Sequence, residues 1–298
     1  MKHLITDIQR FSLSDGPGIR TTVFFKGCNM RCAWCHNPET LSPNEDLLFY
    51  PAKCIGCGKC FSACPTGAQK VADGRHIIDR TLCVKCGKCT EVCYAEALVM
   101  SGREMTVEEI LREVRQDKAY YEASGGGVTL SGGEVLCHVE FAAALAKACR
   151  REGISVAIET NLSFPYAHVK PLLDEVDVVM ADVKLFDDEA HKTYTGVSNK
   201  NIIENLAKIV EIPLIVRTPL IPGVTATEDN LRAIAKHLVG KKNLVQYQLL
   251  NFNPLGASKY AGLDAENAFA EARPYTEGEM RDFGAMLSDI DIPVKVGE

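Results

Sequence analysis

Eleven of the thirteen cysteines lie between Cys28 and Cys93, at spacings suited to holding metal. The first group is Cys28, Cys32 and Cys35, which follows the pattern C-x3-C-x2-C with no fourth cysteine nearby. Three thiolates can hold three irons of a four-iron cluster and leave the fourth iron open, and an open position distinguishes a reactive metal site from a closed one. The alternative is a zinc site with His36 as fourth ligand, which requires a sharp turn of the adjacent backbone.

The other eight clustered cysteines form an internal repeat. Two copies of C-x2-C-x2-C-x3-C begin at Cys54 and Cys83, 29 residues apart. This pattern resembles that of bacterial two-cluster ferredoxins, in which three cysteines of one run and the fourth of the other hold each [4Fe–4S] cluster. The resemblance implies one cluster on Cys54, Cys57, Cys60 and Cys93, and another on Cys83, Cys86, Cys89 and Cys64. Structural zinc is the alternative, but zinc needs two cysteine pairs and leaves the third and fourth cysteines of each run unexplained.

Cys137 and Cys149 stand apart from these groups, in or beside an apolar helical segment. We expect them to pack as small hydrophobic residues rather than to bind metal.

The elements that must position the cysteines are visible after residue 100, where short apolar strands alternate with amphipathic helices. The first helix follows Thr106, an expected N-cap with glutamate at the third helical position. Strands are expected at 20–27, 128–130, 154–158, 176–183, 214–221 and 245–250, and helices at 138–151, 166–175, 188–194, 200–210, 227–239 and 277–289. Such alternation predicts an α/β protein with a parallel sheet. About six units are too few for an eight-unit barrel, so an incomplete barrel and an open sheet both remain.

In either architecture, ligands collect at the carboxyl ends of the strands. The distinctive motifs lie at those ends: Ser131-Gly132-Gly133-Glu134, Glu159-Thr160-Asn161, Asp182-Val183-Lys184 and Arg217. We therefore predict one main domain, made of residues 1–48 and 101–298, and an inserted module over residues 49–100.

A longer stretch identifies a family resemblance. Asp15-Gly16-Pro17-Gly18-Ile19-Arg20, the three-cysteine motif and Trp34-Cys35-His36-Asn37-Pro38-Glu39 together resemble the glycyl-radical-enzyme activating enzymes of the radical S-adenosylmethionine (SAM) superfamily. Apart from the module, the resemblance runs from about residue 7 to residue 262, and the module marks the branch with two extra clusters. It implies a partial (β/α)6 barrel with a ferredoxin-like two-cluster insert. It also implies reductive cleavage of SAM at a [4Fe–4S] cluster, whose 5′-deoxyadenosyl radical removes hydrogen from a glycine of a partner enzyme.

The same resemblance assigns residues to SAM and to a candidate monovalent cation. The SAM set is Trp34, Cys35, His36, Gly132, Gly133, Glu134, Asp182, Val183, Lys184, Arg217 and Asn253. The cation set is Glu159, Thr160, Met180 and Asp182, with Glu159 where aspartate is usual. We expect the Glu134 side chain to accept a hydrogen bond from the amino group of SAM. Asn253 replaces a common histidine, so it can hydrogen-bond but cannot titrate near neutral pH.

Composition narrows the function classes. The 298 residues are 46% hydrophobic and 24% charged, which excludes a disordered chain, and the net charge of −6 argues against nucleic-acid or polybasic membrane binding. No apolar run has the length of a signal or a membrane helix, so we expect a cytoplasmic protein. The expected partners are a glycyl radical enzyme and a one-electron donor such as flavodoxin or ferredoxin. Two alternatives are a radical SAM enzyme acting on a small molecule and a non-catalytic electron carrier.

Overall fold

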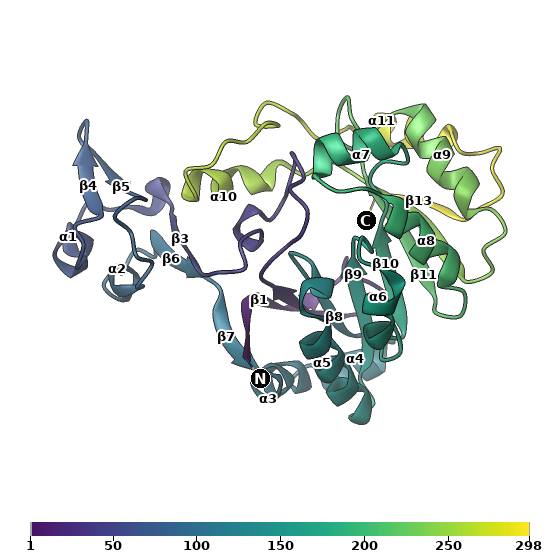
Figure 1. The fold of residues 1–298 in the computed structure, drawn as a ribbon, viewed down its shortest axis with the longest axis horizontal. Helices are drawn as coiled ribbons and strands as arrows, with labels where there is room; N and C mark the ends of the chain where they lie inside the picture. The colour runs from purple at the N-terminus through teal and green to yellow at the C-terminus, as the bar shows by residue number, and fades with distance from the viewer. Residues whose placement is uncertain (1, 298) are drawn as a thin grey trace.

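The centre of the molecule is one nine-stranded sheet, seen in a computed structural model that describes residues 2–297 (Figure 1). Its order is β13-β12-β11-β10-β9-β8-β2-β1-β7. The strands are β1 (Lys2–Ser12), β2 (Arg20–Phe25), β7 (Arg103–Thr106), β8 (Gly127–Gly132), β9 (Ser155–Thr160), β10 (Val178–Asp182), β11 (Leu214–Pro219), β12 (Leu244–Leu250) and β13 (Val294–Val296). The strands from β2 to β13 run parallel, and β1 pairs antiparallel with both β2 and β7. The sheet is therefore mostly parallel, as the alternation predicts, and the strands β13 and β7 end it on its two sides.

Helices connect the parallel strands. They are α3 (Val107–Arg115), α4 (Lys118–Ser124), α5 (Val139–Arg151), α6 (Tyr166–Leu173), α7 (Asp188–Thr195), α8 (Lys200–Lys208), α9 (Glu228–Leu238), α10 (Ala257–Gly262) and α11 (Glu277–Ala285). Helix α3 begins with a capping box in which the Thr106 side chain and Glu109 satisfy each other's free backbone N–H groups, as predicted. Helix α11 ends at Ala285, four residues before the predicted limit. No described helix is long and apolar enough to cross a membrane.

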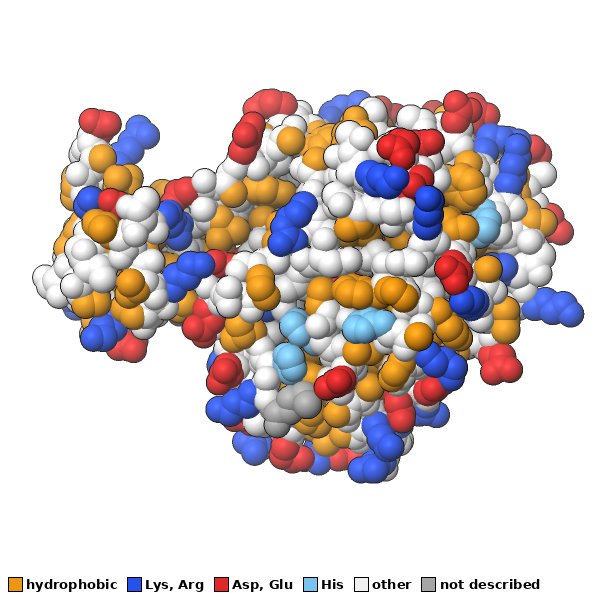
Figure 2. Space-filling view, viewed as in Figure 1, with side chains coloured by type: hydrophobic (Ala, Val, Ile, Leu, Met, Phe, Trp, Pro, Cys, Tyr) orange, Lys and Arg blue, Asp and Glu red, His pale blue; other side chains and the backbone are white. Residues whose placement is uncertain are grey.

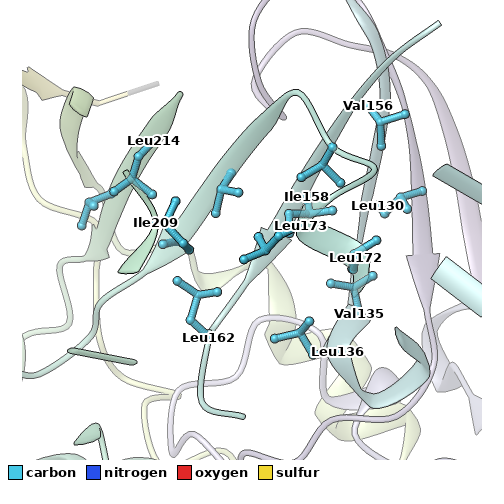
Figure 3. Packing of buried hydrophobic residues seen from close by; sticks show 14 of the residues in the cluster. Leu130, Val135, Leu136, Val156, Ile158, Leu162, Leu172, Leu173, Ile209 and Leu214 are labelled. Atoms are coloured by element: carbon cyan, nitrogen blue, oxygen red, sulfur yellow. The ribbon is translucent and has the colours of Figure 1, made fainter. Parts of the chain in front are cut away.

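The core lies between the sheet and the helices that cover it. Figure 3 shows Leu130 and Ile158 of neighbouring strands near Leu172 of α6, with Leu214 of β11 farther along the same cluster beside Ile209. All four side chains are fully buried, which explains why the strands are apolar almost throughout. Cys149 of α5 is also fully buried in this core, in agreement with its predicted packing role.

Residues 46–101 form a lobe that projects from one side of the sheet (Figure 1). Its elements are β3 (Asp46–Phe49) paired with β6 (Leu98–Ser101), β4 (Gln69–Ala72) paired with β5 (Arg75–Ile78), and the short helices α1 (Lys59–Ala63) and α2 (Lys88–Glu91). The lobe has its own small core, in which Leu47, Phe49 and Ile78 pack with two cysteines, Cys60 and Cys89.

A buried charge bridge ties the lobe to the main domain. Asp46 accepts from Lys26 Nζ at 3.0 Å through one carboxylate oxygen and from Lys85 Nζ at 2.7 Å through the other. The Lys26 side chain is fully buried at the end of β2, so its ammonium needs this partner. Since Lys85 precedes Cys86, the bridge holds the Cys83–Cys89 segment of the lobe toward the main domain.

Candidate functional site

A cavity of about 900 Å³ opens at the carboxyl ends of the parallel strands. Cys28, Cys32 and Cys35 line it, as do the ends of β8, β9, β10 and β11. The distinctive sequence motifs therefore surround one space, at the edge of the sheet where ligands collect in such folds.

The three cysteines sit on the loop that follows β2. This loop is fastened to the end of α7, because Arg31 N donates to Thr195 O at 2.8 Å and Ala33 N donates to Tyr194 O at 3.0 Å. Burial raises the pKa of all three thiols, to about 12 for Cys35, where the neighbouring Cys32 raises it further. Three thiols this buried need a cationic partner to become thiolates, and bound iron supplies one.

The Gly132-Gly133 turn lies directly against the cysteine loop. Gly133 N donates to Phe25 O at 2.9 Å, and Glu134 N donates to Gly27 O at 2.8 Å. A Cβ atom added at Gly133 would stand 2.3 Å from the carbonyl oxygen of Gly27, and Gly132 has a φ of +115°. Both positions therefore require glycine, because the two loops approach more closely than any side chain allows.

We predict that Gly133→Ala detaches these two loops and lowers the unfolding free energy by roughly 1–3 kcal/mol, the usual effect of overpacking. The matched control is Gly278→Ala, a position without a positive φ where the added Cβ would meet no atom closer than 3.9 Å. Thermal unfolding and iron content of both variants, measured without oxygen, test the prediction. Equal behaviour of the two variants would show that the collision with Gly27 is unimportant.

Glu134 holds two loops together. Its carboxylate accepts from Thr160 Oγ1 at 2.6 Å, from Asn161 N at 2.7 Å and from Leu136 N at 3.0 Å. Only 2% of the residue is exposed, and burial raises the pKa of the carboxyl group to about 6. The sequence predicts that this side chain accepts from a ligand amine; in the structure, its hydrogen bonds join the loops after β8 and β9.

An ionic network occupies the next two strand ends. Arg217 Nη1 donates to Glu159 Oε1 at 2.5 Å, while Nε and Nη2 each donate to Asp182 Oδ1 at 3.1 Å. Lys184 Nζ donates to Asp182 Oδ2 at 2.9 Å, and Ser131 donates to Glu159. Burial alone would lower the pKa of Arg217, but the two carboxylates outweigh it and raise that pKa. Two carboxylates and two cations thus neutralise one another around the cavity.

The register of the sheet explains this meeting. Asp182 pairs with Arg217 across β10 and β11, and Glu159 pairs with Met180 across β9 and β10. Residues that are far apart in the sequence are therefore brought together at the carboxyl ends of the strands.

Of the remaining predicted residues, some line the cavity and others are buried in the protein interior. Trp34, His36 and Asn253 line the cavity, and the Asn253 side chain accepts from Leu255 N at 3.0 Å. The side chains of Val183 and Met180 are buried in the protein interior, with exposed fractions of 1% and 2%. These two residues can meet a ligand in the cavity only through their backbone.

Lys259 of α10 is a cavity residue that the sequence analysis missed. Its Nζ donates to Asn37 Oδ1 at 2.6 Å and to Glu39 Oε1 at 2.7 Å, beside the cysteine loop. Asn37 and Glu39 lie in a recognisable motif, but no local signal links them to a lysine more than two hundred residues away.

The cysteines of the lobe form two crossed groups. A second cavity is lined by Cys54, Cys57, Cys60 and Cys93. The pKa of Cys60 is raised by burial and then by its neighbours Cys54, Cys57 and Cys93. The pKa of Cys89 is raised to about 11 by burial and then by Cys83, Cys86 and Cys64. Each group therefore combines three cysteines of one run with the fourth of the other.

Comparisons with known proteins identify the family of the chain. Residues 22–237 match the Radical SAM superfamily. The chain is 44% identical over 276 residues to the benzylsuccinate synthase activating enzyme of Thauera aromatica, covering 89% of this chain and 83% of that protein. It is 41% identical over 274 residues to the (2S)-3-sulfopropanediol dehydratase activating enzyme of Klebsiella oxytoca, covering 87% and 85%. It is 38% identical over 303 residues to the choline trimethylamine-lyase activating enzyme of Oleidesulfovibrio alaskensis, covering 99% and 98%.

A solved structure of low sequence identity shares the fold. A radical SAM methyltransferase from Sphaerobacter thermophilus superposes with a TM-score of 0.53 at 13% identity, over 99% of this chain and 77% of that protein. The predicted family resemblance is confirmed: this chain belongs to the glycyl-radical-enzyme activating enzymes of the radical SAM superfamily, which cleave SAM at a [4Fe–4S] cluster and generate a glycyl radical on a partner enzyme.

Proposed function

We propose that Cys28, Cys32 and Cys35 are the ligands of the family's [4Fe–4S] cluster and that the cavity beside them binds SAM. The observation that carries this proposal is that all three thiols line the same cavity as the ends of four parallel strands. When bound, the cluster supplies one electron to the sulfonium of SAM, whose carbon–sulfur bond then breaks homolytically.

The residues of the chain bind and orient SAM. Gly132 and Gly133 line the cavity, where their backbone would face the amino group. Lys184 and Arg217 place positive charge beside its carboxylate, and both side chains are only 10% exposed. Trp34 packs with Phe252 and other apolar residues along the cavity, which keeps water from the radical.

We propose that the candidate cation site shares its carboxylates with the ionic network. Glu159 and Asp182 would hold a monovalent cation with help from Thr160 and Met180. Arg217 already contacts both carboxylates, so a bound cation would share them with its guanidinium group.

We further propose that residues 49–100 are a ferredoxin-like insert with two [4Fe–4S] clusters in a main domain of residues 1–48 and 101–298, built as a partial (β/α)6 barrel. The crossed grouping of eight cysteines supports this. Within the described residues, no three His, Cys, Asp or Glu side chains converge on a single metal ion. In a four-iron cluster each thiolate binds its own iron, so wider separation of the thiols suits a cluster. The total is then about twelve irons per chain.

The partner is a glycyl radical enzyme, and we propose that it is a lyase, decarboxylase or dehydratase. Relatives at 36–44% identity are named for several such enzymes, including a dehydratase, a decarboxylase and lyases. The electron donor we propose is a flavodoxin or ferredoxin.

The test combines two measurements on protein reconstituted with iron and sulfide without oxygen. Incubation with reductant and SAM should yield 5′-deoxyadenosine. Addition of candidate glycyl radical enzymes one at a time should yield a glycine-centred radical by electron spin resonance with one of them. Absence of 5′-deoxyadenosine with every reductant and partner would overturn the proposal. Its formation with a small molecule as the only hydrogen donor would favour the alternative activity.

The clusters of the insert should relay electrons. We predict that Cys57→Ala combined with Cys86→Ala slows reduction of the Cys28 cluster by a protein donor at least tenfold. SAM cleavage with a small chemical reductant should continue, because that reductant reaches the main cavity directly. Stopped-flow absorbance and 5′-deoxyadenosine yield measure the two rates. Unchanged reduction by the protein donor would assign the insert a structural role instead.

A further inference from the structure

The insert differs in charge from the rest of the chain. Residues 49–100 contain seven Lys and Arg against four Asp and Glu, a net charge of +3. The remaining 246 residues contain 26 against 35, a net charge of −9. Figure 2 shows the lobe with Lys and Arg side chains distributed among apolar ones. A positive lobe on a negative molecule attracts acidic partners to the lobe in particular.

The Ile55–Lys59 loop of the lobe combines features of an interaction surface. Ile55 is 72% exposed, and Cys57, in the proposed cluster, is exposed beside it. The Lys59 ammonium lies 4.1 Å from the centre of the Tyr94 ring, and that tyrosine is 81% exposed. An exposed apolar pair next to cations is the usual composition of a protein interface, with an apolar centre and a charged rim.

Lys53 and Lys59, which lie just before and at the end of this loop, have no acidic partner among the described residues. Each lies over a tyrosine ring instead. Lys70 is paired with Asp79 at 2.7 Å and Arg80 with Asp264 at 2.8 Å, whereas Arg75 and Lys88 also form no ion pair among the described residues. Lys53 and Lys59 are thus two of the lobe cations that are available to an acidic partner, and they are the two that lie near Ile55 and Tyr94.

The equivalent loop of the second repeat has a different position. Val84-Lys85-Cys86-Gly87-Lys88 carries the same pattern, but Lys85 is bound to Asp46 in the bridge to Lys26 of the main domain. The hydrogen bonds and ring contacts of Ile55–Lys59 are made within the lobe. Val84 is 64% exposed and Cys86 is exposed as well, so the two repeats differ in the pairing of Lys85 rather than in their access to solvent.

We propose that Lys53, Ile55, Lys59 and Tyr94 form a docking face for an acidic one-electron carrier protein. This proposal rests on the proposed two-cluster insert. The carrier gives up one electron to the cluster of Cys54, Cys57, Cys60 and Cys93, and no bond forms or breaks. The second cluster, on the side of Asp46 and Lys26, passes the electron on. A glycyl radical partner needs the cavity at Cys28 instead, since its glycine must meet the radical there.

The experiment compares three variants of the reconstituted enzyme: Lys53→Glu with Lys59→Glu, Lys88→Glu alone, and the control Lys200→Glu with Lys236→Glu. The control changes the charge equally on α8 and α9, on the opposite side of the molecule (Figure 1). The probe is an acidic flavodoxin in its hydroquinone form, and cluster reduction is followed by stopped-flow absorbance at several salt concentrations. We expect the first variant to react at least tenfold more slowly at low salt, with a flatter dependence on salt. The control should change by less than a factor of two.

Equal rates for the first variant and the control, or a larger effect of Lys88→Glu, would overturn the proposal. Normal reduction by flavodoxin with impaired activation under photoreduced 5-deazaflavin would assign the face to the glycyl radical partner, which also overturns it. Iron content of the unsubstituted enzyme separates the two proposals: about four irons per chain, rather than about twelve, would show that the insert holds no clusters.

Discussion

Cys32→Ala should abolish formation of 5′-deoxyadenosine while leaving about eight irons bound per chain. Cys32 is one of three thiols on the loop after β2, and among the described residues no fourth cysteine lines the cavity. Two thiolates cannot keep a four-iron cluster at a fixed distance from SAM, so electron transfer to the sulfonium stops. The insert has its own small core and its own eight cysteines, so its clusters should survive.

Iron analysis, the spin-resonance spectrum of the reduced protein and 5′-deoxyadenosine yield measure this outcome. Cys149→Ala is the matched control, because Cys149 lies on α5 in the main core and belongs to none of the cysteine groups. It should retain about twelve irons and full cleavage. Loss of all iron in Cys32→Ala would contradict the independence of the insert, and retained cleavage would contradict the assignment of the three ligands.

Arg217→Ala should lower the unfolding free energy by about 3–5 kcal/mol and weaken SAM binding at least tenfold. The substitution leaves Glu159 with only Ser131 as a partner and removes one of two cations from Asp182. The side chains of both acids are mostly buried, so the uncompensated negative charge is costly. The same negative charge would repel the carboxylate of SAM.

Arg217→Lys distinguishes charge from geometry. A lysine retains the positive charge but cannot reach Glu159 and Asp182 together through separate nitrogens, so it should restore part of the stability and little of the affinity. Denaturant unfolding and calorimetric titration with SAM, both without oxygen, measure the two effects. Arg273→Ala, which breaks an exposed pair with Glu279, should change neither. Full affinity in Arg217→Ala would remove this residue from the SAM site.

Much of the fold follows from local patterns. Apolar strands and capped helices in alternation predict the parallel part of the sheet, because each strand is buried on both faces. Strands β1 and β7 were not predicted. β1 is mostly exposed or half-exposed and has no continuous apolar run, so its pairing depends on tertiary context rather than on composition.

The residues of the site could likewise be predicted in part from the sequence. Cysteine spacing and the motifs at strand ends predict which residues surround the cavity, since parallel strands bring their carboxyl ends to one edge. Spacing says nothing about partners across the sheet. The three hydrogen bonds accepted by Glu134 and the double contact of Arg217 depend on register and loop packing. The same holds for the Lys26–Asp46–Lys85 bridge, which joins residues 20 and 39 positions apart.

The difference in exposure between the cysteine groups has a consequence for damage by oxygen. Cys57 and Cys86 are exposed at the surface of the lobe, whereas Cys28, Cys32 and Cys35 lie half-buried beside the main cavity. Each of the two proposed lobe clusters has one exposed thiol, at which dissolved oxygen would reach it first. Exposure of the enzyme to air should then release iron in two phases, an early one from the lobe and a late one from the main domain. The proposed clusters of the lobe would then lose iron before the cluster at Cys28, Cys32 and Cys35 does.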